Sequence, residues 1–152
     1  MEILIVQLQR EHNPALNAIT AYGDDYVAIN FQRHDHSIFF APEGPIRDLP
    51  VQTAAALTAE HLRSFAGLDQ IKQDPMAFLD DAPPARPDDA PELILIGTGQ
   101  RQHFLNPAIT QEVLRLGIGV EIMDTQAAAR TYNILMAEGR KVVVALLIQE
   151  TA

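Results

Sequence analysis

The sequence predicts an α/β protein that ends in a βαβαβ unit of parallel strands. Apolar runs typical of strands buried on both faces recur at 92–96, 118–123 and 141–148. Two segments with helix start and stop signals lie between these runs, near 107–116 and 125–138. Because short turns join the five elements, we expect the strands to pair in parallel through right-handed crossovers.

The chain before this unit is predicted to be mostly β. We interpret residues 1–16 as a poorly defined N-terminal segment, because a short apolar run is followed there by polar residues and a proline. Ile19–Tyr22 and Tyr26–Ile29 flank the turn cluster Gly23-Asp24-Asp25 and therefore predict a hairpin. Ser37–Phe40 predicts a further strand, ended by a turn rich in Pro and Gly.

The middle of the chain holds one short helix and one loop. Thr58 is a typical N-cap, and we expect a helix at Ala59–Ala66 that Gly67 ends. Residues 80–91 contain four aspartates and four prolines, so we expect an exposed and mobile loop. We expect a single domain over residues 1–152, because this length suffices for one core but not comfortably for two.

The first helix of the βαβαβ unit begins at the N-cap Asn106, with Pro107 in its first turn. Its apolar positions Ile109, Val113 and Leu116 fall on one face, which predicts the face turned to the core.

The second helix begins at the N-cap Asp124-Thr125 and ends at Gly139. We expect Ala128, Thr131 and Leu135 to form its inward face. In the strands we expect three side chains to be buried: Ile96, Val120 and Val144.

Composition excludes several classes of function. There are 20 acidic and 11 basic side chains, a formal charge of −9, which argues against binding to nucleic acid or to anionic lipid. Cysteine is absent, so disulfides and thiol chemistry are excluded. The apolar run Val142–Ile148 is far shorter than the ~20 residues of a membrane-spanning helix. No secretory signal is visible either, so we expect a cytoplasmic protein without stable membrane anchoring.

The turn Gly97-Thr98-Gly99 follows a predicted strand, where α/β sheets commonly bind ligands. A dinucleotide fingerprint would place a third glycine at position 102, where the chain has Gln102, and the next helix begins late, at Asn106. The simpler interpretation is that the two glycines permit a tight turn and a close backbone approach.

A second group of polar residues is predicted near the same edge: Arg101, His103, Arg130 and Asn133. Arg130 and Asn133 are three residues apart on a helix and share a face. With the glycine turn and the helix start at Asp124-Thr125 they would bind a small anion. The alternative is structural: Arg130 and Asn133 tie the helix to neighbouring loops, and Asp124 is a cap.

His34 and His36 would lie on one side of a strand, which is how a two-histidine metal site begins. No third ligand is evident, so we favour a half-exposed polar face. The sequence shows no complete catalytic set. We therefore predict no catalytic residue, no metal and no cofactor.

The segment from Leu93 to Ile148 resembles the Mth938-like domain family, which includes the mitochondrial complex I assembly factor 3. The resemblance rests on Leu95–Gly99, Gly117–Glu121, Met123–Thr125, Ala128–Asn133 and Glu138-Gly139-Arg140, and it is most specific from Asp124 to Gly139. Earlier stretches of the chain resemble it too, so that it extends from about Asn17 onward.

The resemblance implies a three-layer α/β fold with a mixed central sheet and an N-terminal β hairpin. It implies no established enzymatic activity. The mitochondrial relative is implicated in the assembly of respiratory complex I through protein contacts. We therefore predict a non-catalytic interaction or assembly protein, with respiratory-complex components as the partners that the resemblance implies. The alternative is a small-anion or nucleotide-binding protein, or an enzyme, that uses the Gly97-Thr98-Gly99 loop and Arg130. In both cases the expected patch is the carboxyl edge of the parallel strands: Gly97, Thr98, Gly99, Arg101, Asp124, Thr125, Arg130 and Asn133.

Overall fold

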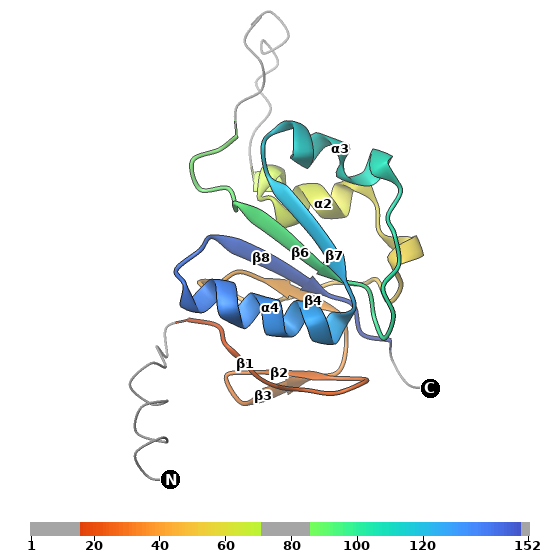
Figure 1. Ribbon diagram of the computed structural model, residues 1–152, viewed down its shortest axis with the longest axis vertical. Coiled ribbons are helices and arrows are strands. Elements are labelled where there is room, and N and C mark those ends of the chain that lie inside the picture. The colour runs from red at the N-terminus through yellow and green to blue at the C-terminus, as the bar shows by residue number, and fades with distance from the viewer. Residues whose placement is uncertain (1–15, 71–85, 150–152) are drawn as a thin grey trace, which may run out of the picture.

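The computed structural model describes residues 16–70 and 86–149, which form two β-sheets and three α-helices (Figure 1). The small sheet has the order β1-β2-β3, and the central sheet has the order β5-β4-β8-β6-β7. The strands are β1 Ile19–Tyr22, β2 Val27–Ile29, β3 Gln32–His34, β4 Ile38–Phe40, β5 Arg47–Asp48, β6 Leu93–Gly97, β7 Gly119–Met123 and β8 Val142–Leu146. The helices are α2 Ala59–Phe65, α3 Pro107–Arg115 and α4 Thr125–Ala137, with 3-10 turns at Ala54–Ala56 and Leu68–Gln70.

The βαβαβ unit predicted from the apolar runs is confirmed. Strand β6 pairs in parallel with β7 on one side and with β8 on the other, so Ile94 lies between Val120 and Val143. Strand β4 joins β8 in the antiparallel direction, which makes the central sheet mixed. The predicted hairpin is confirmed as β1 and β2.

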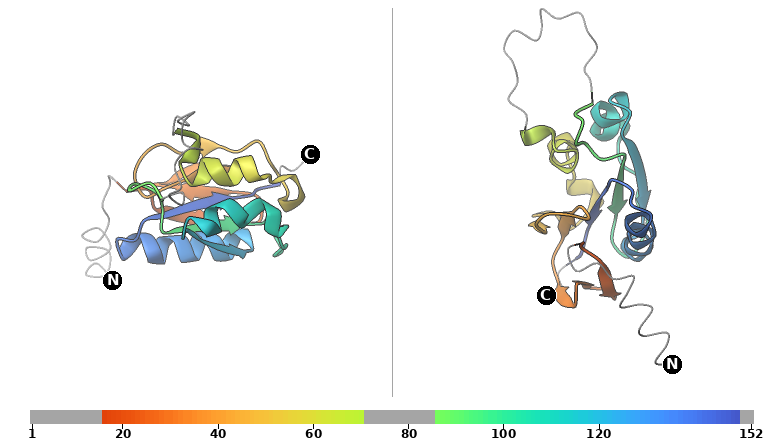
Figure 2. Two further views of the ribbon diagram at one scale, coloured as in Figure 1. Left: turned by 90° about the horizontal axis from the view of Figure 1, so that it is seen from above. Right: turned by 90° about the vertical axis from the view of Figure 1, so that its left-hand side faces the viewer.

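The central sheet is covered on both faces, which gives the three layers (Figure 2). Helices α2 and α3 pack on one face, over a core that includes Leu62, Phe65 and Val113. Helix α4 and the small sheet pack on the other face, where Tyr132 and Phe40 stack edge-on with ring centroids 5.0 Å apart. Strand β6 lies between these two cores, because Ile94 and Ile96 face one core and Leu95 faces the other.

The helix signals read from the sequence act as expected. The Asn106 side chain accepts a hydrogen bond from the Ala108 amide, and the Asp124 side chain accepts one from the Ala127 amide. Gly139 follows α4 in the left-handed conformation, with φ +77°.

Two side chains predicted to be buried are only partly so. On α4, Ala128 is buried and Leu135 packs against the core, as predicted, and Tyr132 is buried beside them. Thr131 lies at the margin of this face, where its hydroxyl contacts the Met123 sulfur, and it is only partly buried. Val120 is only partly buried, because among the described strands β7 has a neighbour on one side alone.

Two short polar strands, β3 and β5, have no signal in the sequence and were not predicted.

Of the predicted loop 80–91, residues 80–85 lie outside the described residues, as do residues 1–15 of the N-terminal segment. Residues 86–91 form no helix or strand, but Ala90 and Pro91 are buried rather than exposed. They are covered because this stretch leads directly into the central strand β6, and Ala90 packs in the core under α2 and α3. None of the described helices combines the length and the apolar character needed to cross a membrane.

Candidate functional site

The carboxyl ends of β6, β7 and β8 meet at one edge of the central sheet, as predicted (Figure 1). Gly97 ends β6 directly beneath the first turn of α4. A methyl group at position 97 would lie 2.7 Å from Cα of Thr125 and 3.1 Å from Cβ of Ala128. Gly97 is therefore required for the close approach of the helix to the sheet.

The loop after Gly97 is held by the side chain of Thr98. Its hydroxyl donates to the Arg101 carbonyl at 2.7 Å and accepts from the His103 amide at 3.0 Å. Gly99 has φ +102°, a conformation that favours glycine. Residues 98–103 are thus a hydrogen-bonded loop with a defined shape.

Thr125 connects this loop to the last strand. Its amide donates to the Gly99 carbonyl, and its hydroxyl accepts from the Gly99 amide, both at 2.8 Å. The same hydroxyl donates to the Leu147 carbonyl at 2.8 Å. The amides of Thr98, Gly99 and Thr125 therefore all donate to atoms of the protein, as does the Ala127 amide to the cap Asp124. This geometry gives the glycine turn a structural role and leaves these four amides unavailable to an anion.

Arg130 and Asn133 contact the small sheet. Asn133 binds the backbone of Ile19 twice: it donates to the carbonyl at 2.7 Å and accepts from the amide at 2.9 Å. Arg130 donates to the Tyr22 hydroxyl at 3.3 Å, and its guanidinium lies 5.8 Å from the centre of the Tyr22 ring. Both residues share a helix face, as predicted, and both tie α4 to β1.

Tyr132 adds a third tie to the same region, which sequence reasoning missed. Its hydroxyl donates to the Asn17 carbonyl at 2.6 Å. Burial raises the pKa of the Tyr132 phenol well above its usual range, so the group stays protonated and keeps this hydrogen bond.

Phe104 is the exposed side chain that the sequence analysis passed over. It is 90% exposed, just beyond the loop segment that Thr98 holds, and the neighbouring Arg101 and His103 are exposed as well. A large aromatic residue directly after the polar run Gln100–His103 was the available signal.

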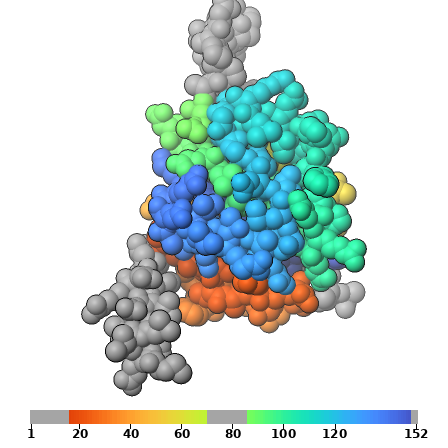
Figure 3. Space-filling view, viewed as in Figure 1, coloured from red at the N-terminus to blue at the C-terminus, as the bar shows by residue number. Residues whose placement is uncertain are grey.

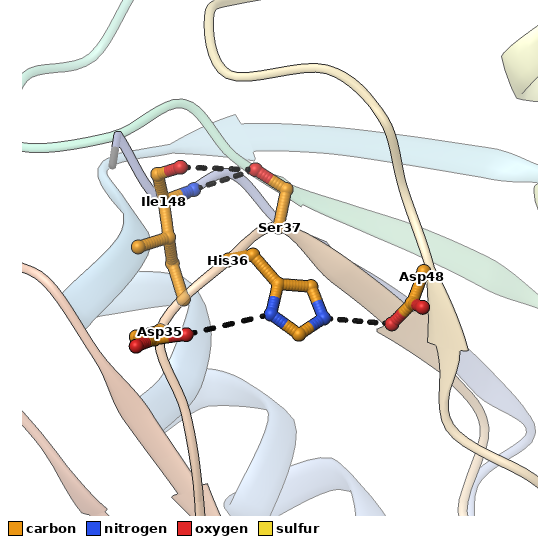
Figure 4. A network of polar contacts seen from close by, with 5 residues as sticks. All are labelled: Asp35, His36, Ser37, Asp48 and Ile148. Carbon is orange, nitrogen blue, oxygen red and sulfur yellow. Dashed lines mark hydrogen bonds and ion pairs between the residues drawn. The ribbon is translucent and has the colours of Figure 1, made fainter.

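The two histidines lie near each other: His34 ends β3, and His36 lies on the connection from β3 to β4. Protonated His36 donates to the Asp48 carboxylate at 2.7 Å and lies 3.6 Å from Asp35 (Figure 4). The Asp48 carboxylate raises the pKa of His36, whereas burial lowers the pKa of His34. Beside them the Ser37 hydroxyl donates a hydrogen bond to the Ile148 carbonyl and accepts one from the Ile148 amide. Within the described residues no group of three or more ligating side chains is arranged to hold a metal ion.

One further hollow lies at the opposite end of the parallel strands. It has a volume of about 560 Å³, and its lining includes Pro42, Met136, Lys141 and Val142. None of the predicted patch residues lines it.

Residues 19–147 match the model of a protein family described as "Protein of unknown function (DUF498/DUF598)". The solution structure of a Mth938-like domain from Bordetella pertussis is 55% identical, with a TM-score of 0.75 over 93% of this chain and 91% of that chain.

Two named relatives match a shorter segment. NADH dehydrogenase (ubiquinone) 1 alpha subcomplex assembly factor 3 of Mus musculus is 39% identical over 56 residues, which are 37% of this chain and 30% of that protein. The 13 kDa major membrane protein of Francisella tularensis is 40% identical over 52 residues, 34% of this chain and 42% of that protein. The match thus spans less than half the length of either relative.

Proposed function

We propose that this chain, which belongs to the Mth938-like family of proteins of unknown function (DUF498/DUF598), is a non-catalytic interaction or assembly protein. The observation that carries the proposal is Phe104. Its ring is 90% exposed beside a loop whose shape is fixed by Thr98. Exposed aromatic and arginine side chains are enriched at protein interfaces, and a loop that is already ordered loses little entropy on binding.

The contact surface that we propose extends the predicted patch by one residue. Phe104 and Arg101 would touch the partner. Gly97, Thr98, Gly99, Asp124 and Thr125 would hold the loop in place. Arg130 and Asn133 would fix the adjoining small sheet.

The likeness to an assembly factor supports respiratory-complex components as the class of partner. The cytoplasmic location is part of the proposal, and the acidic charge of −9 supports the lack of a stable membrane anchor, because it disfavours docking on anionic lipid. Because one relative is named a major membrane protein, the location should be checked directly by fractionating the native cell.

Cross-linking from the loop tests the proposal. A photoreactive phenylalanine analogue at position 104 should capture a defined protein in the native cell. Position 31 is the matched control, because Phe31 is 83% exposed in the turn between β2 and β3. With the analogue at position 104, Arg101→Ala should weaken capture. In a pull-down of the captured protein by the chain without the analogue, Phe104→Ala should lower its recovery while the thermal midpoint stays unchanged.

Equal capture from positions 104 and 31, or unchanged recovery of the captured protein in the pull-down with Phe104→Ala, would refute the proposed surface. A small molecule that co-purifies with the wild-type chain and is lost in Arg130→Ala would favour the anion-binding alternative instead.

A further inference from the structure

Strand β7 forms one outer edge of the central sheet and pairs only with β6 among the described residues. The Gly119 amide donates to Glu92, and the Met123 carbonyl accepts from the Thr98 amide, so the backbone of positions 119, 121 and 123 faces β6. The backbone of Val120 and Ile122 therefore faces outward. Figure 3 shows this side of the molecule, with β7 running between α3 and α4.

Exposed apolar side chains flank this edge on both faces of the sheet. Glu112 of α3 pairs with Arg63 of α2, so Leu114, about 200° further round the helix, lies on the side of α3 turned away from α2. Thr131 of α4 contacts Met123 at the end of β7, and Ile134 lies one turn further along that side. Leu114 is 51% exposed and Ile134 is 59% exposed.

Within the described chain, one side chain forms a hydrogen bond to the outward backbone of β7. The Gln102 side chain donates to the outward carbonyl of Ile122 at 3.1 Å, and Gln102 is itself exposed. An exposed single hydrogen bond is readily exchanged for another donor, because water competes for both groups.

The negative charge of Glu121, at the centre of β7, determines which kind of strand can pair with this edge. A symmetric pair of two copies that aligns β7 along its whole length is centred on Glu121, so Val120 of each chain would lie opposite Ile122 of the other. The two Glu121 carboxylates would then lie directly opposite each other. Like charges in that position destabilise strand pairing, and each copy carries a further excess of acidic groups. A partner strand with a basic side chain at this position meets the opposite charge.

We propose that the outer edge of β7 accepts an extended segment of a partner protein as a sixth strand. Its apolar side chains lie on the α3 face, against Val120, Ile122 and Leu114. A lysine or arginine on the other face pairs with Glu121. This inference rests on the proposed function as an interaction protein and assigns it a second contact, next to the loop that carries Phe104. Backbone hydrogen bonds supply the affinity of such added strands, and alternate side chains supply the specificity.

The test uses the full chain and a capped peptide of about seven residues that alternates valine with lysine, long enough to span β7. Amide exchange is measured by NMR. In the free chain the amides of Val120 and Ile122 should exchange faster than those of Glu121 and Met123, which donate to β6. Saturating peptide should slow Val120 and Ile122 by at least roughly tenfold, because both become hydrogen-bonded.

Two controls separate strand addition from attraction between opposite charges. A peptide of the same sequence, methylated on alternate backbone nitrogens, should not bind, because it lacks the donors of a paired strand. Glu121→Gln should weaken binding roughly twofold to fivefold, the effect of one exposed ion pair, and Glu60→Gln on α2 should leave it unchanged.

Equal binding of the methylated peptide, or unchanged exchange at Val120 and Ile122, overturns the proposal. A concentration-dependent dimer of the chain alone that protects these two amides also overturns it, in favour of a second copy. Neither result affects capture through Phe104, so the failure of this inference remains distinguishable from failure of the proposed function.

Discussion

On one side of α4 the outer edge of β1 is closed by Asn133, whose amide both donates to and accepts from the backbone of Ile19. On the other side the outer edge of β7 receives, within residues 16–70 and 86–149, one side-chain hydrogen bond, from the exposed Gln102. In both places a side-chain carboxamide forms hydrogen bonds with the backbone of a strand at the edge of a sheet. The two carboxamides differ in burial and in the number of bonds, and therefore in how easily another strand would replace them.

This difference separates structural residues from candidate contact residues. The most specific part of the sequence resemblance, Asp124 to Gly139, contains α4, whose polar side chains tie the small sheet to the helix. The exposed residues Phe104 and Leu114 lie outside that segment. A polar residue with defined hydrogen bonds inside the fold can carry a strong sequence pattern for structural reasons alone.

The largest effect is expected when a core side chain is removed from β6, the strand on which the packing of both α4 and β7 depends. Ile96→Ala should lower the free energy of unfolding by ~2–5 kcal/mol, because it leaves a cavity in the core strand β6. Denaturant titration measures this loss. Ile134→Ala on the exposed side of α4 should change stability by less than about 0.5 kcal/mol, and a comparable loss there would contradict the assignment of that side as a free surface.

The next effect tests the contact between α4 and the sheet. Gly97→Ala should cost roughly 1–3 kcal/mol, because the new methyl group meets the backbone of Thr125. Gly119→Ala is the matched variant: its methyl group meets the flexible end of Leu93 at 3.0 Å, so a smaller cost is expected. Equal losses, measured by thermal unfolding of both variants, would show that α4 is not held closely at Gly97.

The two carboxamides can be compared directly. Asn133→Ala should destabilise the chain by about 1–3 kcal/mol and expose the Ile19 amide to exchange, because both backbone groups of Ile19 lose their partner. Gln102→Ala should cost less than about 0.5 kcal/mol. The comparison fails if Gln102→Ala proves as destabilising as Asn133→Ala.

The smallest effect concerns β5, the opposite edge of the central sheet. Because Asp48 raises the pKa of His36 above 6.5, His36 contributes stability that is complete below pH 6.5 and lost as pH rises through its folded pKa. The lowered pKa of His34 acts in the opposite sense: its contribution is lost as pH falls from 6.5 through its folded pKa. Stability should therefore pass through a shallow maximum near pH 6.5, and the effect should be slight because the His36 side chain is 40% exposed.

NMR titration of the two imidazoles should therefore find His36 above 6.5 and His34 below it. Asp48→Asn should lower the pKa of His36 more than Asp35→Asn does, because Asp48 is the closer carboxylate. The reverse order would show that β5 does not hold His36.

Sequence alone determined the βαβαβ unit and the hairpin. Caps such as Asn106 and Asp124, the glycine stops and the apolar runs are local signals, and each acts within a few residues of where it is read. The resemblance added the mixed sheet and the three layers. The role of the patch remains a prediction. The sequence correctly located two of its parts, the loop after Gly97 and the start of α4 at Asp124.

Tertiary structure alone decided which strand ends up at an edge and what covers it. Val120 is half-buried because β7 has one neighbour, and β3 and β5 exist only through their partners. Asn133 and Ile19 are 114 positions apart, so no local pattern could reveal that one closes the backbone of the other. Residues at an edge obtain their surroundings from distant parts of the chain, whereas periodicity and caps report only on near neighbours.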